Sequence, residues 1–513
     1  MRRRVFLRRH LVIAVSLALL TVLAAGASAT KVVRGAKAAR TPLSASANPV
    51  PRENLRPGAT SWSLDQTARR RRIEGYASEV SVLPGRRVHF HVSTFPAARY
   101  RIVLYRSGWY RGKGARIVAC IPRGCKTDRK GKARRRPRPA RGTGLVRARW
   151  PVTDTFRFPR TAVSGIYLAK LELTQGRARG KVTYIPVILR ERPARRSTIL
   201  VQVAVSTWQA FNSWGGKSFF PATSTRGIPA SHISFNRPYN PLRPVPLQWD
   251  IGLVRFLERE GYNVSYTTDV DTDRNPRELR RHRLVISAGQ DEFWSKRTRD
   301  AFEAARNSGT NLAFIGAEIG EWQIRFANAR RTIVKYPDAA SDPVADPTRK
   351  TVRFANLVPP RPECQLRGVG YGGGLRGPDD PPRSYAVNPA ALGDSWFRDT
   401  GFTATSELPD SVGYVWDSVQ PGCAVPPVTV LFHYDGVGPR GPTTADAARY
   451  TAPSGARVFS SGSLYFVYGL DNYYGHREVP PDPRLRQFMR NALADLTVKH
   501  SAKRALDARG DGQ

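Results

Sequence analysis

The chain has 513 residues, of which 41% are hydrophobic, so it can build two or three domains with real cores and is not a disordered protein. Its 83 Lys and Arg against 40 Asp and Glu give a formal net charge of +43, a value that would ordinarily suggest a nucleic-acid partner. The excess is uneven, because residues 123–149 alone carry twelve basic residues and one acidic residue. We interpret this stretch as an exposed basic insertion that suits an anionic cell-envelope polymer, and nucleic acid is not the expected partner.

Residues 1–29 have the pattern of an export signal. Basic residues come first, an apolar run covers 11–25, and Ala27-Ser28-Ala29 forms a small-residue cleavage site. The pair Arg3-Arg4 also fits a twin-arginine signal, so both the Sec and the twin-arginine routes stay open. We therefore expect a secreted or cell-envelope-associated protein with no transmembrane segment after cleavage. Residues 30–72 are rich in Pro, Ser, Ala and Arg and predict a flexible tether, and residues 501–513 predict a disordered tail.

Residues 73–191 alternate apolar and polar positions with a period of two, which predicts an all-β, immunoglobulin-like sandwich that ends with a strand over 181–189. Val88, Phe90 and Val92 should face the core. His89 and His91 should then face solvent together, where a two-histidine metal site would lack a third ligand.

The four cysteines predict two disulfides, since an even number in an exported chain favours pairing. We expect Cys120 to pair with Cys125 and Cys364 to pair with Cys423. A zinc site is the weaker alternative, because no CxxC spacing or neighbouring histidine pair accompanies them.

From 195 to 500 the pattern changes to alternating strands and helices, which predicts an α/β domain with a doubly wound parallel sheet. The expected strands cover 198–205, 262–267, 284–286, 311–315, 456–460 and 464–468. The expected helices cover 247–260, 277–281, 296–307 and 483–498. Between 324 and 452, Pro and Gly predict long excursions with some short strands.

The carboxyl ends of the strands should meet at one edge of the sheet, where open α/β sheets bind ligands. This edge would collect Ser206, Thr207, Trp208, Asp269, Asp271, Gln290, Asp291, Glu292, Glu318, Ser460 and Ser463. Several carboxylates in one place favour either a metal ion or a general acid–base pair. The plainer alternatives are that Asp291 caps a turn, Glu292 forms a salt bridge, and Asp269 and Asp271 only shape a turn.

Other hydrolase signatures are missing from the sequence. It contains no GxSxG, phosphate-binding loop or HExxH, and no cysteine follows a predicted strand. The loop after the first α/β strand instead offers an aromatic wall of Trp208, Phe211, Trp214 and Phe220. This wall suits a small, uncharged, partly apolar ligand, and packing of the rings in the core is the alternative.

Several sequence blocks resemble the C-terminal domain of the large subunit of N,N-dimethylformamidase and its exported relatives. These blocks are TWQAFNSWGGKS (207–218), GYNVSYTTDVD (261–271), SAGQDEFWS (287–295) and NLAFIGAEIGEWQIRF (311–326). The blocks IEGYAS (73–78), YRSGWYRGKGAR (105–116) and SGIYLAKL (164–171) resemble the sandwich that precedes that domain. The resemblance covers roughly residues 70–500 and implies a class I glutamine amidotransferase-like sheet after the sandwich.

The resemblance also implies an iron ion held by two tyrosines and a glutamate. By motif, Glu292 matches the glutamate, Tyr167 matches one tyrosine, and Phe211 stands where the second tyrosine is expected. Gln290 and Phe293 occupy positions that are commonly histidine and tyrosine in relatives. Iron binding is therefore expected to be weak or absent.

The resemblance predicts a hydrolase that acts on the C–N bond of a small linear amide. Catalysis would involve Glu292 and a general base, either Asp291 or Glu318, with Asn212 or Lys217 near the oxyanion. Trp208, Phe211 and Trp214 would contact the substrate. The alternative is a non-catalytic, envelope-associated binding protein that has lost the metal site.

Overall fold

Eight stretches of the chain are described in the computed structural model, and all of them belong to one compact unit. They are residues 48–63, 67–68, 71–240, 247–375, 380–423, 425–438, 441–471 and 480–498. The expected export signal, the first part of the tether and the expected C-terminal tail lie outside them. Among the described helices, none is both long and apolar enough to cross a membrane.

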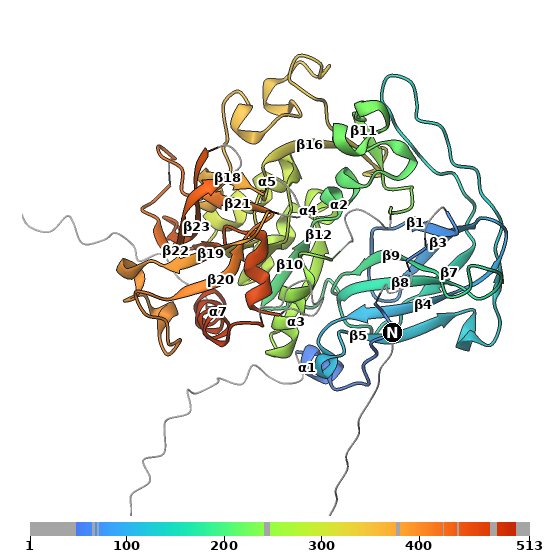
Figure 1. Cartoon of the computed structure of the whole chain (residues 1–513), viewed down its shortest axis with the longest axis horizontal. Coiled ribbons are helices and arrows are strands. Elements are labelled where there is room, and N and C mark those ends of the chain that lie inside the picture. The colour runs from blue at the N-terminus through green and yellow to red at the C-terminus, as the bar shows by residue number, and fades with distance from the viewer. Residues whose placement is uncertain are drawn as a thin grey trace, which may run out of the picture. The chain divides into compact units, whose positions relative to one another are not determined.

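Two sheets form the N-terminal part of the described chain (Figure 1). The smaller is antiparallel and contains, in spatial order, β1 (Ile73–Ala77), β3 (Arg87–Thr94) and β7 (Asp154–Arg157). The larger contains β2 (Ser81–Val82), β9 (Val182–Leu189), β8 (Gly165–Leu173), β4 (Arg99–Ser107) and β5 (Ala115–Ile121), with β6 (Arg129–Lys130) paired to β4. Val88, Phe90 and Val92 share one core with residues of the larger sheet, as the period of two predicts.

The expectation that His89 and His91 face solvent together is wrong for His91. His91 is buried, its ring stacks on Tyr76 with centroids 4.5 Å apart, and its Nδ1 lies 2.8 Å from the carbonyl oxygen of Trp150. His89 is partly exposed and pairs with Glu79 at 2.8 Å. The segment that contains Trp150 covers one end of this face, so the alternation along β3 is real but the second face is not open to water.

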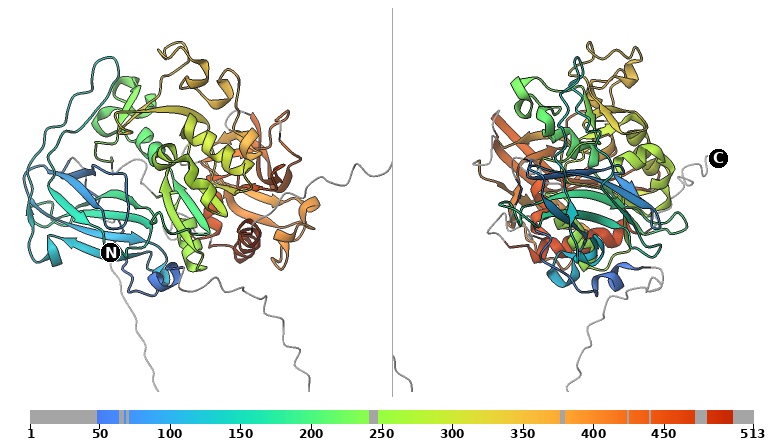
Figure 2. Two further views of the ribbon diagram at one scale, coloured as in Figure 1. Left: turned by 180° about the vertical axis from the view of Figure 1, so that it is seen from behind. Right: turned by 90° about the vertical axis from the view of Figure 1, so that its right-hand side faces the viewer.

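The expectation of a fully exposed basic insertion is also wrong for its second half. Val146, Ala148 and Trp150 are buried at alternate positions, and the Ala148 amide donates to the carbonyl of Asn236 at 2.7 Å. The segment thus extends from the N-terminal sheets to the neighbourhood of β11 (His232–Ser234) (Figure 1, Figure 2). Three apolar residues spaced by two were the available signal, and the many surrounding arginines hid it.

Residues 48–63 differ from the expected flexible tether. They contain α1 (Val50–Asn54), and Trp62 is fully buried with its indole nitrogen donating to the carbonyl of Lys113 at 2.9 Å. The Asn54 side chain accepts from the Tyr110 amide at 2.8 Å. These contacts are with residues of the connection between β4 and β5, which are distant in sequence, and composition alone does not reveal them.

The central sheet has nine strands and makes the chain a mixed α/β protein. Five strands are parallel, in the order β12 (Val264–Thr268), β10 (Ile199–Val203), β13 (Leu284–Ala288), β15 (Asn311–Ile315) and β24 (Arg457–Ser460). Four antiparallel strands continue it, namely β23 (Gly441–Thr451), β22 (Thr429–Gly438), β19 (Arg383–Val387) and β20 (Glu407–Val412). The predicted parallel sheet is therefore only part of a larger mixed sheet. Gly and Pro interrupt the apolar pattern of β22 and β23, which is why the sequence did not predict strands of this length.

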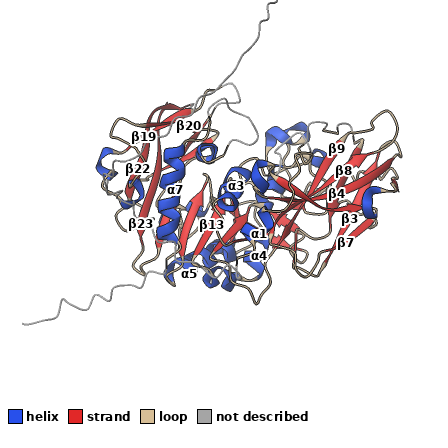
Figure 3. Cartoon of the chain, turned by 90° about the horizontal axis from the view of Figure 1, so that it is seen from below, coloured by secondary structure: helices blue, strands red, loops and turns tan. Residues whose placement is uncertain are grey.

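Helices cover both faces of the parallel strands (Figure 3). α3 (Ile251–Arg259) and α7 (Pro483–Leu496) share a core with Ile199, Val201 and Ile286, whereas α5 (Lys296–Asn307) shares a core with the intervening Leu200 and Val285. Successive side chains of a strand point to opposite faces, so one apolar run serves both layers. The shorter helices are α2 (Val205–Phe211), α4 (Asp269–Arg274) and α6 (Cys364–Arg367).

Helix ends follow the sequence closely where a cap is present. α5 has the predicted bounds, and the side chain of Ser295 accepts from the Thr298 amide at its start. The predicted strand 464–468 is wrong, because these residues form the 3-10 helix η11 (Leu464–Gly469), whose first turn is capped by Ser463. A short, wholly apolar run fits a buried helical turn as well as a strand, so periodicity could not decide between them.

Two small sheets and two disulfides complete the described structure. The strands β11, β17 (Thr332–Val334), β16 (Trp322–Ala327) and β14 (Phe293–Ser295) form one sheet, and β18 (Gly370–Gly374) pairs with β21 (Val415–Ser418). Both predicted disulfides are present, with Cα separations of 5.4 Å for Cys120–Cys125 and 6.1 Å for Cys364–Cys423. These separations lie in the range that disulfides require.

Candidate functional site

A sharp turn follows β13 and brings the residues 290–292 to the edge of the sheet. Gly289 has a φ of +68°, and a Cβ on Gly316 would overlap the carbonyl oxygen of Gly289. The Gly289 amide donates to the carbonyl of Ile315 at 2.8 Å. Glycine is therefore required at both positions for the ends of β13 and β15 to approach this closely.

Asp291 lies at this edge and is completely buried. Its Oδ2 accepts from Gln202 Nε2 at 2.6 Å and from Ser287 Oγ at 2.8 Å. Its Oδ1 has no hydrogen-bond partner in the part of the chain that the structure describes. Burial raises the pKa of Asp291 to about 6, because the charged form loses its hydration.

Two further carboxyls interact with Asp291. Asp250, which precedes α3, has its pKa raised to about 8 by burial and then by the charge of Asp291. Asp269, at the start of α4, has its pKa raised well above its ordinary value by the same two causes, and its Oδ2 accepts from the Ser206 amide at 2.9 Å. Like charges repel in a buried site, so Asp250 and Asp269 retain their protons at neutral pH beside the charge of Asp291.

Glu292 and Glu318 form a second set of neighbouring carboxyls, the carboxyl pair, on either side of the Gln290 amide. Gln290 Nε2 donates to Glu318 Oε2 at 2.6 Å and lies 3.5 Å from Glu292 Oε2. Burial and the charges of Glu321 and Asp417 raise the pKa of Glu318 to about 8. Burial and the charge of Glu318 raise the pKa of Glu292 well above its ordinary value.

The backbone at Glu318 is strained, with a φ of +54° that non-glycine residues rarely adopt. Its amide donates to Asp417 Oδ1 at 3.1 Å, and this contact holds the turn after β15 in place. Lys335 supplies a nearby positive charge that lowers the pKa of Glu292, and its ammonium lies 3.9 Å from the centroid of the Trp322 ring. The backbone turn thus positions Glu318, and the charge of Lys335 acts on Glu292, the other member of the carboxyl pair.

Four phenylalanines form a cluster that includes Phe293, the residue after Glu292. Phe293 directly follows Glu292, and its ring centroid lies 5.7 Å from that of Phe219, 6.1 Å from Phe220 and 6.5 Å from Phe211. Phe211 and Phe220 stack with centroids 4.2 Å apart. The predicted aromatic wall is in this part a packed cluster of Phe211, Phe219, Phe220 and Phe293.

The other predicted substrate-binding residues have different surroundings. Trp214 Nε1 donates to Glu74 Oε2 at 2.8 Å, and Lys217 Nζ donates to the carbonyl of Ile228 at 2.6 Å. The Asn212 amide is buried, and its nitrogen donates to Gln209 Oε1 and to the carbonyl of Pro238. Trp208 is buried in the core shared with α3. These contacts stabilise the loop, and the assignment of the four residues to substrate binding stays a prediction.

Tyr167 lies in β8, in the core between the two N-terminal sheets. Its hydroxyl donates to the carbonyl of Val163 at 2.8 Å, and its ring packs against Phe158 with centroids 5.0 Å apart. Burial raises the pKa of the hydroxyl, so it does not ionise at neutral pH. With Phe211 lacking an oxygen, the residues present do not fit an iron site made of two tyrosines and a glutamate.

The remaining residues of the predicted edge have structural contacts. Asp271 accepts from Thr268 Oγ1 at 2.7 Å in the cap of α4 and pairs with Arg190 at 3.2 Å, in keeping with the turn-forming alternative. Ser463 caps η11, and Ser460 Oγ donates to the carbonyl of Arg367 at 2.8 Å. Thr207 Oγ1 accepts from the Phe293 amide at 3.3 Å.

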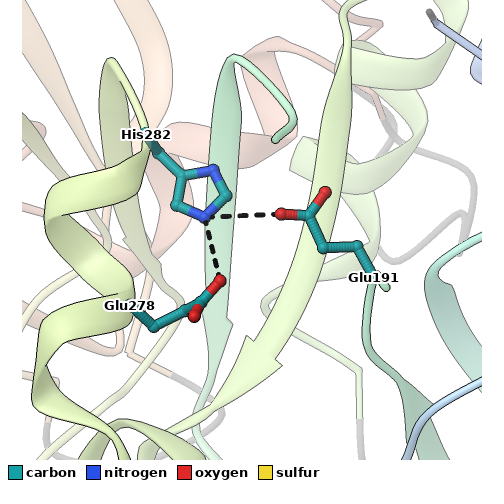
Figure 4. Close-up of side chains that lie close together, drawn as sticks. All are labelled: Glu191, Glu278 and His282. Atoms are coloured by element: carbon teal, nitrogen blue, oxygen red, sulfur yellow. Dashed lines mark ion pairs between the residues drawn. The ribbon is translucent and has the colours of Figure 1, made fainter. Parts of the chain in front are cut away.

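A separate group of side chains could hold a metal ion (Figure 4). One ligand atom from each of Glu191, Glu278 and His282 lies within 4.8 Å of the others. Glu191 follows β9, and His282 directly follows the 3-10 helix η6 (Pro276–Arg281), which contains Glu278. Sequence reasoning missed this group, although a glutamate and a histidine four residues apart were visible.

Sequence reasoning also missed Gln202 and Asp250. A glutamine in the otherwise apolar strand ILVQV was a signal for Gln202, since a buried polar side chain needs a partner. Asp250 stands directly before α3, where an aspartate is expected to cap the helix, but its side chain makes no cap hydrogen bond. Its interaction with Asp291 depends on packing between distant segments.

The chain was compared with protein-family models and with curated proteins. A protein-family model described as N,N-dimethylformamidase beta subunit-like, C-terminal, matches residues 101–478, which is well over half of the chain. A search of curated proteins found no match. The family match begins in β4 and extends beyond η11. It therefore includes the buried aspartates around Asp291 and the carboxyl pair of Glu292 and Glu318.

Proposed function

The chain belongs to the N,N-dimethylformamidase beta subunit-like family, and from this premise we propose that it is an amidohydrolase that cleaves the C–N bond of small linear amides. The observation that carries the proposal is the pair of carboxyls, buried Glu292 and half-buried Glu318, around the amide of Gln290. Such a pair can supply both the base and the acid that amide hydrolysis needs.

Protonation supports this assignment. The raised pKa of Glu318, about 8, keeps it a carboxylic acid at neutral pH, and the charges of its neighbours make simultaneous ionisation of both glutamates unfavourable. One carboxyl can then accept a proton while the other donates one. We assign Glu292 as the base, because the nearby charge of Lys335 favours its ionised form, and Glu318 as the acid.

The proposed reaction is balanced without a further reactant. Glu292 removes a proton from water, and the oxygen of that water attacks the carbonyl carbon of the amide. The C–N bond then breaks, and Glu318 protonates the departing nitrogen. The products are a carboxylic acid and an amine, and proton exchange with solvent restores the two glutamates.

The cluster of Phe211, Phe219, Phe220 and Phe293 supports a preference for uncharged, partly apolar amides. Phe293 follows Glu292 directly, and Lys335, whose charge acts on Glu292, lies 5.8 Å from the centroid of the Phe219 ring. Asn212 and Lys217 remain the predicted donors near the oxyanion. Either would have to exchange an existing intramolecular hydrogen bond for one to the substrate.

The assay is amine release from formamide, N-methylformamide and N,N-dimethylformamide by the purified full-length protein. We expect Glu318→Gln and Glu292→Gln each to reduce kcat by about 100-fold or more, which is the usual contribution of a positioned acid or base. Glu407→Gln is the matched control, because Glu407 is exposed on β20, and it should retain full activity. Equal activity of all three variants would refute the assignment.

Iron is implied by the family resemblance, but the residues present do not fit it, so no step above uses iron. We propose that the unmodified protein binds iron weakly or not at all and that Phe211→Tyr, combined with Phe293→Tyr and Gln290→His, raises its iron content. Phe220→Tyr is the matched control, since Phe220 stacks on Phe211 but has no ligand role. Stoichiometric iron in the unmodified protein that survives Glu292→Ala would overturn this proposal.

A second candidate function is a non-catalytic binding protein of the cell envelope. It is supported by the missing oxygen at Phe211 and by a hollow of about 520 Å³ lined by arginines, including Arg134, Arg138 and Arg149. This lining suits an anionic envelope polymer. Salt-sensitive binding of soluble polyphosphate that is lost in an Arg134→Gln, Arg138→Gln and Arg149→Gln variant, without any amide hydrolysis, would favour it.

Export and domain organisation are part of the same proposal. The two disulfides and the absence of a membrane-crossing helix in the described residues are compatible with an exported protein. We propose cleavage after residue 29, which N-terminal sequencing of protein from the culture medium would test. We also propose that 73–191 and 195–500 are separate domains and that the second has a class I glutamine amidotransferase-like fold, which its five parallel strands and covering helices support.

A further inference from the structure

We propose that Glu191, Glu278 and His282 bind one divalent zinc ion that stabilises the fold, at a site distinct from the carboxyl groups near Asp291. His282 Nε2 lies 3.5 Å from Glu191 Oε1 and 3.7 Å from Glu278 Oε1 (Figure 4). Glu191 lies about 90 residues before Glu278 and His282 in the sequence, so folding brings two distant stretches of the chain together. Nothing in the proposed amide hydrolysis involves them.

The separations between these atoms suit a shared cation better than direct hydrogen bonds. Hydrogen bonds between nitrogen and oxygen are about 2.7–3.2 Å long, and both distances exceed that range. Zinc holds oxygen and nitrogen ligands at about 2.0–2.1 Å, and tetrahedral geometry then places two ligand atoms roughly 3.4 Å apart. Small side-chain adjustments would bring all three atoms to one ion.

The orientation of His282 supports the same assignment. Its Nδ1 lies 2.9 Å from the carbonyl oxygen of Ser197, so Nδ1 carries the proton and donates it. Metal-binding histidines usually have such a partner, because it fixes the ring and leaves the other nitrogen as the ligand. Nε2 then presents a lone pair to two carboxylates, an arrangement that is repulsive unless a cation lies between them.

Two of the ligand atoms are buried and lack a hydrogen-bond partner among the described residues. His282 Nε2 and Glu191 Oε1 have no hydrogen-bond partner among the described residues, and the His282 side chain is 0% exposed. The other Glu191 oxygen accepts from the Ser197 amide at 3.1 Å. An unpartnered ring nitrogen in the interior loses a substantial hydrogen-bond energy, and a bound metal ion would recover it.

The charges around the group are compatible with a divalent ion. Arg281 contacts both oxygens of Glu278, at 3.1 and 3.0 Å, and Asn275 donates to Glu278 Oε2 at 3.2 Å. A carboxylate oxygen that accepts one hydrogen bond keeps a second lone pair for a metal. Two glutamates and a neutral histidine leave the fourth position of a tetrahedral zinc for water.

The position of the group indicates a structural role. Glu191 lies in the connection from β9 to β10, and His282 lies just before β13. Ile199 of β10 and Leu284 of β13 are register partners at the amino ends of these parallel strands, whereas Asp291 lies beyond their carboxyl ends. An ion there would tie the connection between the N-terminal sheets and the central sheet to the η6–β13 connection.

The test uses full-length protein that has been stripped of metal with a chelator and then given Zn²⁺ alone. We expect about one zinc per chain by elemental analysis and a higher melting temperature with zinc than without it. His282→Ala and Glu191→Gln should each weaken zinc binding by about 100-fold, the upper end of what the loss of a supporting residue costs.

The matched control is His433→Ala, because His433 also pairs with a carboxylate, Asp446, at 2.6 Å but belongs to no three-ligand group among the described residues. It should keep full zinc content. Because His282→Ala can fail to fold, Glu278→Gln at the more exposed ligand provides a second variant that should also lose zinc.

Three outcomes would overturn the proposal. The first is no zinc bound by the folded wild-type protein, with a melting temperature that depends on pH alone, which would mean that a proton on Nε2 bridges the carboxylates. The second is full zinc content in both His282→Ala and Glu278→Gln. The third is loss of zinc in Glu292→Gln but not in Glu278→Gln, which would place the ion at the carboxyl pair. Amine release is measured separately, so failure of the hydrolase proposal leaves this test intact.

Discussion

Asp250 illustrates how burial controls the chemistry of individual residues in this chain. The carboxyl is fully buried, its Oδ1 has no hydrogen-bond partner among the described residues, and the charge of Asp291 acts on it. Its pKa is raised from 3.8 to about 8. The folded protein therefore holds the neutral acid at pH values where an unfolded chain would have lost the proton.

This raised pKa predicts a specific dependence of stability on pH. The contribution of Asp250 is fully present below about pH 3.8 and is lost as the pH rises toward about 8, because the unfolded state binds fewer protons over that interval. Asp250→Asn replaces the neutral acid with a permanently neutral amide. We expect the melting temperature of the variant, relative to wild type, to increase between about pH 5 and pH 8.5.

Comparing the two proteins at each pH removes other titrations from the measurement. Burial lowers the pKa of His91, so its contribution to the stability of the protein is lost as the pH falls below the ordinary pKa of histidine. That pH dependence is opposite in direction to the one expected for Asp250. Asp435→Asn, at an exposed position on β22, should show no such trend. A difference between Asp250→Asn and wild type that stays constant with pH would contradict the assignment of a protonated Asp250.

Single elements differ in how much of their structure is local. α5 is determined by a serine cap and an apolar stripe that includes Ala301, Phe302 and Ala305, and its predicted bounds are confirmed. η11 has a cap as well, but its apolar sequence suits two conformations, and packing selected the helical one. The segment of Val146, Ala148 and Trp150 is not a strand, yet it is buried by contacts with Tyr76 of β1, Trp214 and Asn236.

That segment yields a stability prediction. Trp150 packs with Trp214 at a centroid distance of 5.9 Å and donates from its indole nitrogen to the carbonyl of Arg135. Trp150→Ala should reduce the free energy of unfolding by about 3 kcal/mol, because a large buried ring leaves a cavity. Urea denaturation would measure it.

Val152→Ala is the matched control, since Val152 lies two residues further along the same segment but is half exposed. It should change the free energy of unfolding by less than about 0.5 kcal/mol. A similarly small effect of Trp150→Ala would mean that the basic insertion is as mobile as its composition suggested.

At the scale of the whole molecule, a buried ion pair connects the N-terminal sheets with the central sheet. Arg106 of β4 donates to both oxygens of Glu258 on α3, at 2.9 and 2.7 Å, and both side chains are fully buried. Asn54 of α1 and Tyr266 of β12 also donate to Glu258. One carboxylate of α3 thus accepts hydrogen bonds from three other elements.

Removing one partner of this pair should be costly. Arg106→Met leaves the Glu258 charge buried, and we expect a loss of about 3–5 kcal/mol in the free energy of unfolding. The double variant Arg106→Met and Glu258→Met should recover part of that loss, because two apolar side chains need no partner. Urea denaturation of the single and double variants gives the coupling between the two residues.

Arg101 and Glu172 provide the control pair, since they lie on neighbouring strands with partly exposed side chains 3.0 Å apart. Arg101→Met should cost no more than about 1 kcal/mol, as is usual for exposed pairs. Comparable losses in the free energy of unfolding for Arg101→Met and Arg106→Met would show that burial does not raise the cost of breaking the Arg106–Glu258 pair.

What the sequence determined by itself rests on local periodicity, on a helix cap and on the number of cysteines. It predicted the inward residues of β3, the bounds of α5 and β15, and the start of α7. It also predicted both cysteine pairs. These follow from the repeat of a helix or strand and from the even number of cysteines, and neither needs knowledge of distant contacts.

Only the tertiary structure decided which polar side chains meet. Asp250 interacts with Asp291, and Glu191 faces His282, although long stretches of chain separate the partners. His91 is buried because the Trp150 segment returns over it, which no pattern within β3 records. Contacts of this kind depend on how whole elements pack, and burial then changes the pKa and the partners of each side chain. The carboxyl groups and the Glu191–Glu278–His282 group are therefore products of packing between elements that the local sequence specifies only one at a time.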